Sequence, residues 1–225
     1  MIGTIVNTCT IIIGTIAGSL LHRGIKDKYK EVLYTALGLA SLGIGLNAFI
    51  SNISKSEYPV LFIIAMAIGS IIGTALDLDG RFTRLVNRRS KNKENRLAEG
   101  LSTATLLYCI GPLSMLGPVV SALQGDHTFL YTNATLDLIS AMVFASTYGI
   151  GMLLAAPVLF CWQGLFYLVA RLSSEAVSES MMAELLIVGG LLITASGLSL
   201  LRLKDCKTLN MLPALLIPIL WFLFN

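Results

Sequence analysis

Apolar stretches of about 20 residues recur along the chain and are separated by short polar connections. A helix needs about 20 mostly apolar residues to cross a bilayer. The pattern therefore predicts an all-α, polytopic transmembrane bundle of about eight helices, or seven if residues 131–171 do not form a full hairpin. The predicted helices cover residues 2–22, 32–52, 58–77, 98–123, 131–153, 156–171, 181–201 and 208–224.

Residues 131–171 allow three interpretations, namely one long helix, a hairpin or a re-entrant pair. The stretch GIGMLLAAP (149–157) contains glycines and a proline that can interrupt a helix. Lys and Arg of short loops are retained on the cytoplasmic side. A hairpin, with the N-terminus outside, puts fourteen of the sixteen basic residues inside, whereas a single helix moves Arg202, Lys204 and Lys207 outside. The charges favour eight helices with both termini outside.

Composition supports a membrane protein. The chain is 55% hydrophobic and only 13% charged, where soluble domains have about 25% charged residues. We treat residues 1–225 as a single transmembrane domain, with three helices in 1–77, a basic cytoplasmic loop in 78–97 and the remaining helices in 98–225. The basic run at 81–96 is typical of a cytoplasmic loop, so we expect no nucleic-acid partner. The four cysteines lack metal-site spacing, and we expect no metal and no cofactor.

Asp137 is the first candidate for function. It lies about two turns into the helix predicted at 131–153, and it is the only charged residue between positions 128 and 170. An acid at membrane depth is costly and marks a functional site by default. Asn133 and Ser140 recur on its face at helical spacing. A buried carboxyl can carry a proton or bind a cation, and the alternative is a hydrogen-bonded acid that locks two helices together.

The segment YCIGPLSMLGPVVSALQGD (108–126) predicts a discontinuous helix, because Pro112 and Pro118 each follow a glycine. Backbone groups freed at membrane depth must be satisfied by protein or line a wet cavity, and broken helices present such groups to substrates in many transporters. The alternative is a kinked helix that only shapes the bundle. The residues predicted to line a substrate or ion pathway are Asp137, Asn7, Gly111, Pro112, Ser114, Gly117, Ser140, Gln124, Asp126 and Asn133.

Two similar segments, IGTIAGS (13–19) and IGSIIGT (68–74), predict close helix packing. Each carries a pair of small residues four positions apart, which lets helix backbones approach closely in lipid. The predicted packing residues are Gly14, Gly18, Gly69 and Gly73. Packing within the bundle and packing across a homo-oligomer both remain open.

Seven separated motifs carry a resemblance to a known family. They are MIGTIVNT, GTIAGSLLHRGI, IGSIIGTALDLDGR, CIGPLSMLGPVVSALQGD, LDLISAMVFASTYGIG, ELLIVGGLLITASGLSLL and NMLPALLIPIL. In this order they resemble the bacterial membrane family called domain of unknown function 554, over almost the whole chain. The resemblance implies a multi-pass protein of the bacterial cytoplasmic (inner) membrane, in a family whose members are often described as transporters.

Three classes of function follow from these features. The first is a small secondary transporter or channel for an unknown small solute or ion, proton- or cation-coupled through Asp137. The second is an intramembrane enzyme, which we do not expect, because neither HExxH nor GxSxG occurs. The third, a non-catalytic scaffold, partner subunit or sensor in the lipid bilayer, stays open. A water-accessible cavity at Asp137 would favour transport, and a sealed, packed interior would favour the scaffold.

Overall fold

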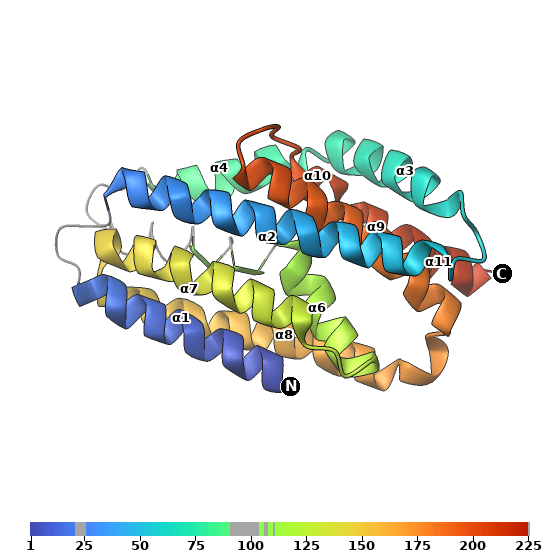
Figure 1. Cartoon of the computed structure of the whole chain (residues 1–225), viewed down its shortest axis with the longest axis horizontal. Coiled ribbons are helices and arrows are strands. Elements are labelled where there is room, and N and C mark those ends of the chain that lie inside the picture. The colour runs from blue at the N-terminus through green and yellow to red at the C-terminus, as the bar shows by residue number, and fades with distance from the viewer. Residues whose placement is uncertain (21–25, 91–103, 106–107, 110, 225) are drawn as a thin grey trace. The chain divides into compact units, whose positions relative to one another are not determined.

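The computed structural model describes residues 1–20, 26–90, 104–105, 108–109 and 111–224, which form helices and no strands. The all-α prediction is therefore confirmed for the described residues. The chain groups into two compact units (Figure 1). Unit 1 contains Met1–Leu33 and Thr83–Ser174, and unit 2 contains Tyr34–Phe82 and Glu175–Asn225.

Unit 1 is built around a helical hairpin in the region that the sequence left open. Its helices are α1 (Ile2–Leu20), α6 (Pro112–Leu123), α7 (Thr128–Tyr148), the 3-10 helix η1 (Ile150–Leu154) and α8 (Ala155–Leu172). Gly149 ends α7 with a φ of +84°, a left-handed conformation that glycine adopts without a steric penalty. After this residue the chain reverses, and α8 runs opposite to α7 (Figure 1). The hairpin prediction for 131–171 is confirmed.

Helices α1 and α7 run in parallel and pack closely. A Cβ atom placed on Gly3 would lie 2.6 Å from the Leu130 side chain, and one on Gly18 would lie 2.2 Å from the carbonyl oxygen of Met142. A Cβ atom on Gly14 would lie 2.4 Å from the carbonyl oxygen of Leu138. Small residues therefore bring the two backbones together.

The predicted break in the helix at 108–123 occurs at its first glycine. Tyr108 and Cys109 are helical, Gly111 is extended (φ −77°, ψ 149°), and Pro112 starts α6 as its first residue, a position where its missing N–H costs nothing. The second expected break does not occur, because α6 continues through Pro118. Neighbouring helices allow a proline to be retained inside a membrane helix. Residues 98–103, 106–107 and 110 lie outside the described part of the chain.

Unit 2 contains most of α2 (Asp27–Ile53) together with α3 (Leu61–Ala75), the start of α4 (Leu78–Ser90) and α9 (Glu179–Leu200). Its other elements are η2 (Ser174–Ala176, mostly in this unit), α10 (Thr208–Met211), η3 (Leu212–Leu215) and α11 (Leu216–Phe224). Helices α2 and α9 are antiparallel, because Gly38 lies against Gly197 and Leu201, whereas Gly45 lies against Gly190 and Thr194. In a bundle of eight passes, α2 and α9 cross the membrane in opposite directions. If residues 131–171 formed a single helix, the bundle would have seven passes and these two helices would be parallel.

The basic segment at 78–97, predicted as a cytoplasmic loop, begins with a helix. It is helical over Leu78–Ser90, and residues 91–97 lie outside the described part of the chain. Helices α3 and α4 meet at an angle of 41°. Asp77 forms the bend with a φ of +49°, which Asp tolerates better than most residues. The amide of Asp79 donates to Asn210 Oδ1 at 2.8 Å, so the first turn of α4 is capped.

Within the described residues, five helices are long and apolar enough to cross a membrane. They are Ile2–Leu20, Lys28–Ile53, Thr128–Tyr148, Ile150–Leu172 and Glu179–Leu200. The bent pair of α3 and α4 makes a sixth if it is one span, and Pro112–Leu123 and Thr208–Phe224 are shorter apolar helices. Helix α1 turns Ile5, Ile13 and Ile16 outward, as expected of a surface in lipid. The polytopic bundle is confirmed.

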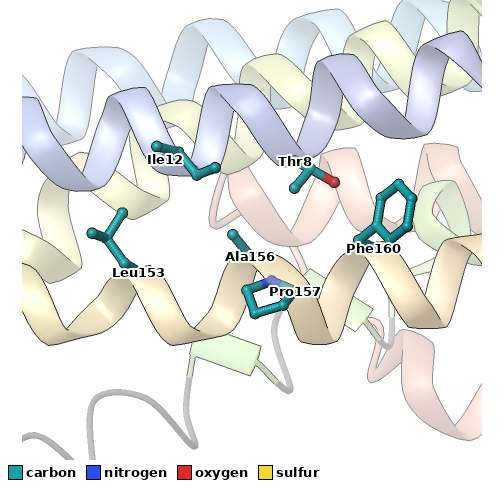
Figure 2. Close-up of a pocket in the computed structure, with 6 residues that line it drawn as sticks. All are labelled: Thr8, Ile12, Leu153, Ala156, Pro157 and Phe160. Atoms are coloured by element: carbon teal, nitrogen blue, oxygen red, sulfur yellow. The ribbon is translucent and has the colours of Figure 1, made fainter.

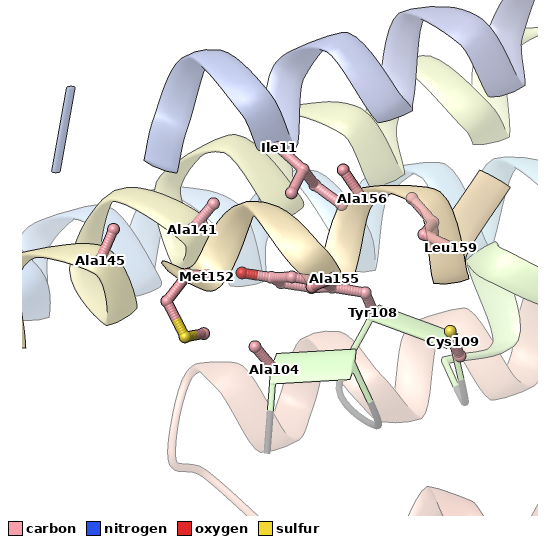
Figure 3. Packing of buried hydrophobic residues seen from close by; sticks show 10 residues of the cluster. All are labelled: Ile11, Ala104, Tyr108, Cys109, Ala141, Ala145, Met152, Ala155, Ala156 and Leu159. Carbon is pink, nitrogen blue, oxygen red and sulfur yellow. The ribbon is translucent and has the colours of Figure 1, made fainter. Parts of the chain in front are cut away.

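The core of unit 1 lies where α1, α7 and α8 meet the segment before α6 (Figure 3). Ile11, Tyr108 and Leu159 are at most 1% exposed and belong to one buried cluster. Alanines of α7 and α8 complete this cluster, and their small side chains allow the close approach of the helices. Cys109, two residues before Gly111, also belongs to this cluster.

Candidate functional site

Three polar side chains meet between α1 and α7, and we call them the Asn7–Asn133–Asp137 cluster. Asp137 Oδ2 accepts a hydrogen bond from Asn7 Nδ2 at 3.0 Å and another from Asn133 Nδ2 at 2.8 Å. Asn7 is 0%, Asp137 5% and Asn133 6% exposed. Asn133 precedes Asp137 by one helical turn, so its amide reaches the carboxyl oxygen that also accepts from Asn7. The structure thus brings three of the predicted pathway residues together.

The depth of Asp137 makes this cluster unusual. Asp137 is the tenth of the 21 residues in α7, which places it about 14 Å from the start of the helix at 1.5 Å per residue. This position is near the middle of a candidate membrane span. In the described part of the chain, the recorded hydrogen bonds of Asp137 come from neutral amides. A charge on this carboxyl would therefore lack a basic partner there and would be costly.

Helix α1 holds Asn7 in place through a neighbouring hydroxyl. Thr10 Oγ1 lies 2.7 Å from the backbone oxygen of Asn7 and 3.4 Å from its Oδ1. Because Oδ1 is near a donor on its own helix, the Nδ2 group is turned toward Asp137. The amide of Asn7 therefore links the local structure of α1 to the carboxyl group of α7.

A second polar contact in unit 1 joins α6 to α8. Gln163 Nε2 donates to Ser114 Oγ at 3.2 Å, and both residues are 0% exposed. Gln163 Oε1 has no hydrogen-bond partner. Ser114 was a predicted pathway residue, and it lies in the first turn of α6 after Gly111 and Pro112. The pathway prediction missed Gln163, although an amide within the apolar helix at 156–171 was a usable signal.

In the described structure, the other predicted pathway residues do not take part in the hydrogen bonds of the cluster. Gly117 packs against Leu130, with a Cβ atom placed on Gly117 lying 3.1 Å from that side chain. Ser140 is buried one turn beyond Asp137. Gln124 and Asp126 are exposed in the connection between α6 and α7. Their roles in a pathway stay predictions.

Asp126 has a structural role at the start of α7. Its Oδ1 accepts from the backbone amide of Thr128 at 2.8 Å and from Thr128 Oγ1 at 2.6 Å. We expect Asp126→Ala to lower the free energy of unfolding by about 0.5–1.5 kcal/mol for each hydrogen bond lost. Thermal unfolding in detergent measures the change. Gln124→Ala is the matched control, and an equal loss in both variants would contradict a stabilising role for the bonds of Asp126 to Thr128.

The other pair of predicted packing glycines lies in unit 2. A Cβ atom placed on Gly69 would lie 2.3 Å from the backbone nitrogen of Ala214, and one placed on Gly73 would lie 2.0 Å from the carbonyl oxygen of Asn210. These glycines therefore allow α3 to pack antiparallel to the α10–η3 segment. All four predicted glycines contact other helices of their own unit.

A pocket of about 400 Å³ lies between α1 and the η1–α8 segment (Figure 2). It is lined by Thr8, Ile12, Leu153, Ala156, Pro157 and Phe160. Thr8 is the one lining residue with a polar side chain, and its hydroxyl donates to the backbone oxygen of Thr4 at 2.8 Å. The pocket is apolar, and none of the three cluster residues lines it. It suits a hydrocarbon chain better than a polar solute.

Comparisons with known proteins agree on the family. The sequence model described as "Protein of unknown function (DUF554)" matches residues 2–223. The chain is 51% identical over 218 residues to "Uncharacterized membrane protein YdfK" of Bacillus subtilis (strain 168), an alignment that covers 97% of this chain and 94% of that protein. It is 28% identical over 225 residues to "Uncharacterized protein YqgA" of Escherichia coli (strain K12), which covers 96% and 94%.

No solved structure matches the chain significantly. The match over nearly all residues agrees with the resemblance carried by the seven motifs, and the apolar helices agree with a membrane protein. The chain is therefore an integral helical membrane protein that belongs to the DUF554 family.

Proposed function

We propose that this protein is a small secondary transporter or channel for a small solute or ion, in which Asp137 carries a proton or a cation. The observation that carries the proposal is a carboxyl group near the middle of a candidate span whose recorded hydrogen bonds come from two neutral amides. Lipid penalises such a group unless it takes up a proton or a cation. Carboxylate and amide oxygens are also ligands that hard cations accept.

Transport requires the cluster to be exposed to each side of the membrane in turn. Because Asn7 is on α1 and Asp137 is on α7, binding at the carboxyl would alter the hydrogen bond that connects the two helices. A ligand shifts a conformational equilibrium only by its differential affinity for the two states. The Asn7–Asp137 hydrogen bond would differ between the two states and so supports this proposal.

A scaffold, partner subunit or sensor is the second candidate, and the packing favours it. Asp137, Asn7 and Asn133 bond to one another, and the glycines of α1 seal the α1–α7 contact. In addition, the pocket beside α1 is apolar and does not include the cluster. In this proposal Asp137 stabilises the pairing of α1 with α7 and carries nothing.

Ion flux into liposomes tests the first proposal against the second. We expect the parent protein to pass protons or radioactive sodium faster than protein-free liposomes, and Asp137→Asn to return the flux to the protein-free rate. Glu175→Gln, which changes an exposed carboxyl, is the control and should retain the parent rate. Equal fluxes for the parent and Asp137→Asn would end the coupling role, and no flux in any variant would favour the scaffold.

The remaining proposals concern placement and partners. We propose that the chain resides in the bacterial cytoplasmic membrane with both termini outside, as the bias of basic residues supports. We also propose that it has no enzymatic activity and no nucleic-acid partner, and that it forms a homo-oligomer. The apolar side chains that α1 turns outward are available to lipid or to a second copy.

A further inference from the structure

Unit 2 contains a second buried carboxyl group that the function proposed above does not use. Glu184 is 0% exposed and is the sixth residue of α9. Its Oε1 accepts hydrogen bonds from the hydroxyl of Ser56 and, at 3.4 Å, from the backbone amide of Tyr58. Its Oε2 is buried and has no hydrogen-bond partner. A buried carboxyl oxygen without a partner is costly, and the cost falls when a cation or a proton binds.

The surroundings of Glu184 add negative potential. Ser56 follows the C-terminal end of α2 at Ile53, where the helix dipole is negative. The last turn of α2 contains no basic residue. Glu184 itself lies beyond the first turn of α9, and the positive end of a helix dipole acts mainly within that turn. The carboxyl group and the end of α2 therefore both favour a positive ligand between them.

The charged neighbours do not neutralise Glu184 in the described part of the chain. Lys55 and Glu57, in the connection between α2 and α3, are exposed. Glu57 accepts a hydrogen bond from the hydroxyl of Ser180. Glu179, on the same helix as Glu184, is also exposed. None of these three described side chains pairs with Glu184, so a positive ligand would come from elsewhere.

We propose that Glu184, with the Ser56 hydroxyl at the end of α2, forms a binding site for one monovalent cation, either Na⁺ or a proton. A single carboxyl group suits a charge of one. Among the described residues, no group of three His, Cys, Asp or Glu side chains can hold a metal ion, which argues against a divalent ion, since divalent ions usually take several carboxylate ligands. The site lies in unit 2, and it does not depend on transport through Asp137.

Thermal unfolding of the full chain in lipid nanodiscs tests the sodium form of this site. Replacing choline chloride by sodium chloride at constant ionic strength should raise the Tm of the parent protein, because a ligand that binds only the folded state stabilises it. Glu184→Gln should lose this shift. Glu57→Gln changes an exposed carboxyl next to Ser56 in the same connection and should retain the shift. Asp137→Asn should also retain it.

Infrared difference spectra between acidic and basic pH test the proton form. The parent and Glu57→Gln should show a component of the protonated-carboxyl band that comes from apolar surroundings, and Glu184→Gln should lack this component. If Glu184→Gln does not fold, Ser56→Ala decides, because it retains the carboxyl group and should weaken the sodium shift or move the titration of the band. The proposal is overturned if neither sodium nor pH produces a response that depends on Glu184 or Ser56. If Asp137→Asn loses the ion flux but keeps the sodium and pH responses, the site at Glu184 is independent of the site at Asp137.

Discussion

A methyl group added at Gly18 is expected to destabilise the protein by about 1–3 kcal/mol, the range for overpacked sites. The new Cβ atom would lie 2.2 Å from the carbonyl oxygen of Met142 and 2.8 Å from its Cα atom. Both neighbours are backbone atoms of α7, so no side-chain rotation can relieve the contact. Helices α1 and α7 must separate instead. Chemical or thermal unfolding of Gly18→Ala in detergent micelles measures the loss.

Gly43 provides the matched control, because it is also inside a helix but has no neighbour within 4 Å of an added Cβ atom. Alanine is favoured over glycine inside a helix by about 0.5–1 kcal/mol, so Gly43→Ala should be neutral or stabilising. The gain in helix propensity from alanine is the same at both positions. The difference between the two variants in the free energy of unfolding therefore measures the packing of α1 on α7. Equal stability changes in the two variants would show that the helices are not in close contact at Gly18.

The same variant connects packing to the candidate site. Asn7 lies on α1 between Gly3 and Gly14, and all three residues face α7. A separation of the helices at Gly18 would therefore lengthen the Asn7–Asp137 hydrogen bond. The predicted packing glycines and the predicted pathway acid, which the sequence presented as separate features, belong to one helix contact.

Much of the fold was predictable because membrane burial leaves a strong signal in sequence. Long apolar runs mark helices, and Gly149 and Pro157 mark the hairpin between α7 and α8. The direction of α2 relative to α9 agrees with the charge bias that favoured eight passes. The last apolar segment was less predictable, because it is divided into three short helices.

The sequence indicated most of the polar residues in the candidate site, but it did not indicate which of them contact each other. Asp137 and Asn7 each stood out as polar groups in apolar helices, while their contact depends on how α1 packs on α7. Helical spacing already placed Asn133 on the face of Asp137. The Ser114–Gln163 contact joins α6 to α8. The periodicity of the sequence does not show that these two helices pair. Likewise, the sequence placed Asp126 in a pathway, and only its hydrogen bonds to Thr128 show that it holds the start of α7.

Removing the carboxyl group of Asp137 is expected to cost more than any other single change considered. Asp137→Ala leaves the amides of Asn7 and Asn133 buried without their acceptor, and each unsatisfied group costs about 1–3 kcal/mol. We therefore expect a loss of about 2–6 kcal/mol in the free energy of unfolding. Asp137→Asn retains an oxygen acceptor in the same place and should cost less. A smaller loss in Asp137→Ala than in Asp137→Asn would contradict the hydrogen bonds described for the cluster.

A double-mutant cycle of Asn7→Ala and Asp137→Ala, repeated across pH, then distinguishes a transporter from a scaffold. Hydrogen bonds between neutral side chains in membrane proteins contribute about 0.6 kcal/mol on average, whereas bonds to a charged group contribute about 1.5–3 kcal/mol. If Asp137 exchanges a proton, the coupling energy should rise with pH, because the ionised carboxylate accepts the Asn7 hydrogen bond more strongly. If Asp137 only locks α1 to α7, the coupling should stay near the neutral value at every pH that the folded protein tolerates. The cycle measures stability, so it tests proton exchange without knowledge of the transported solute.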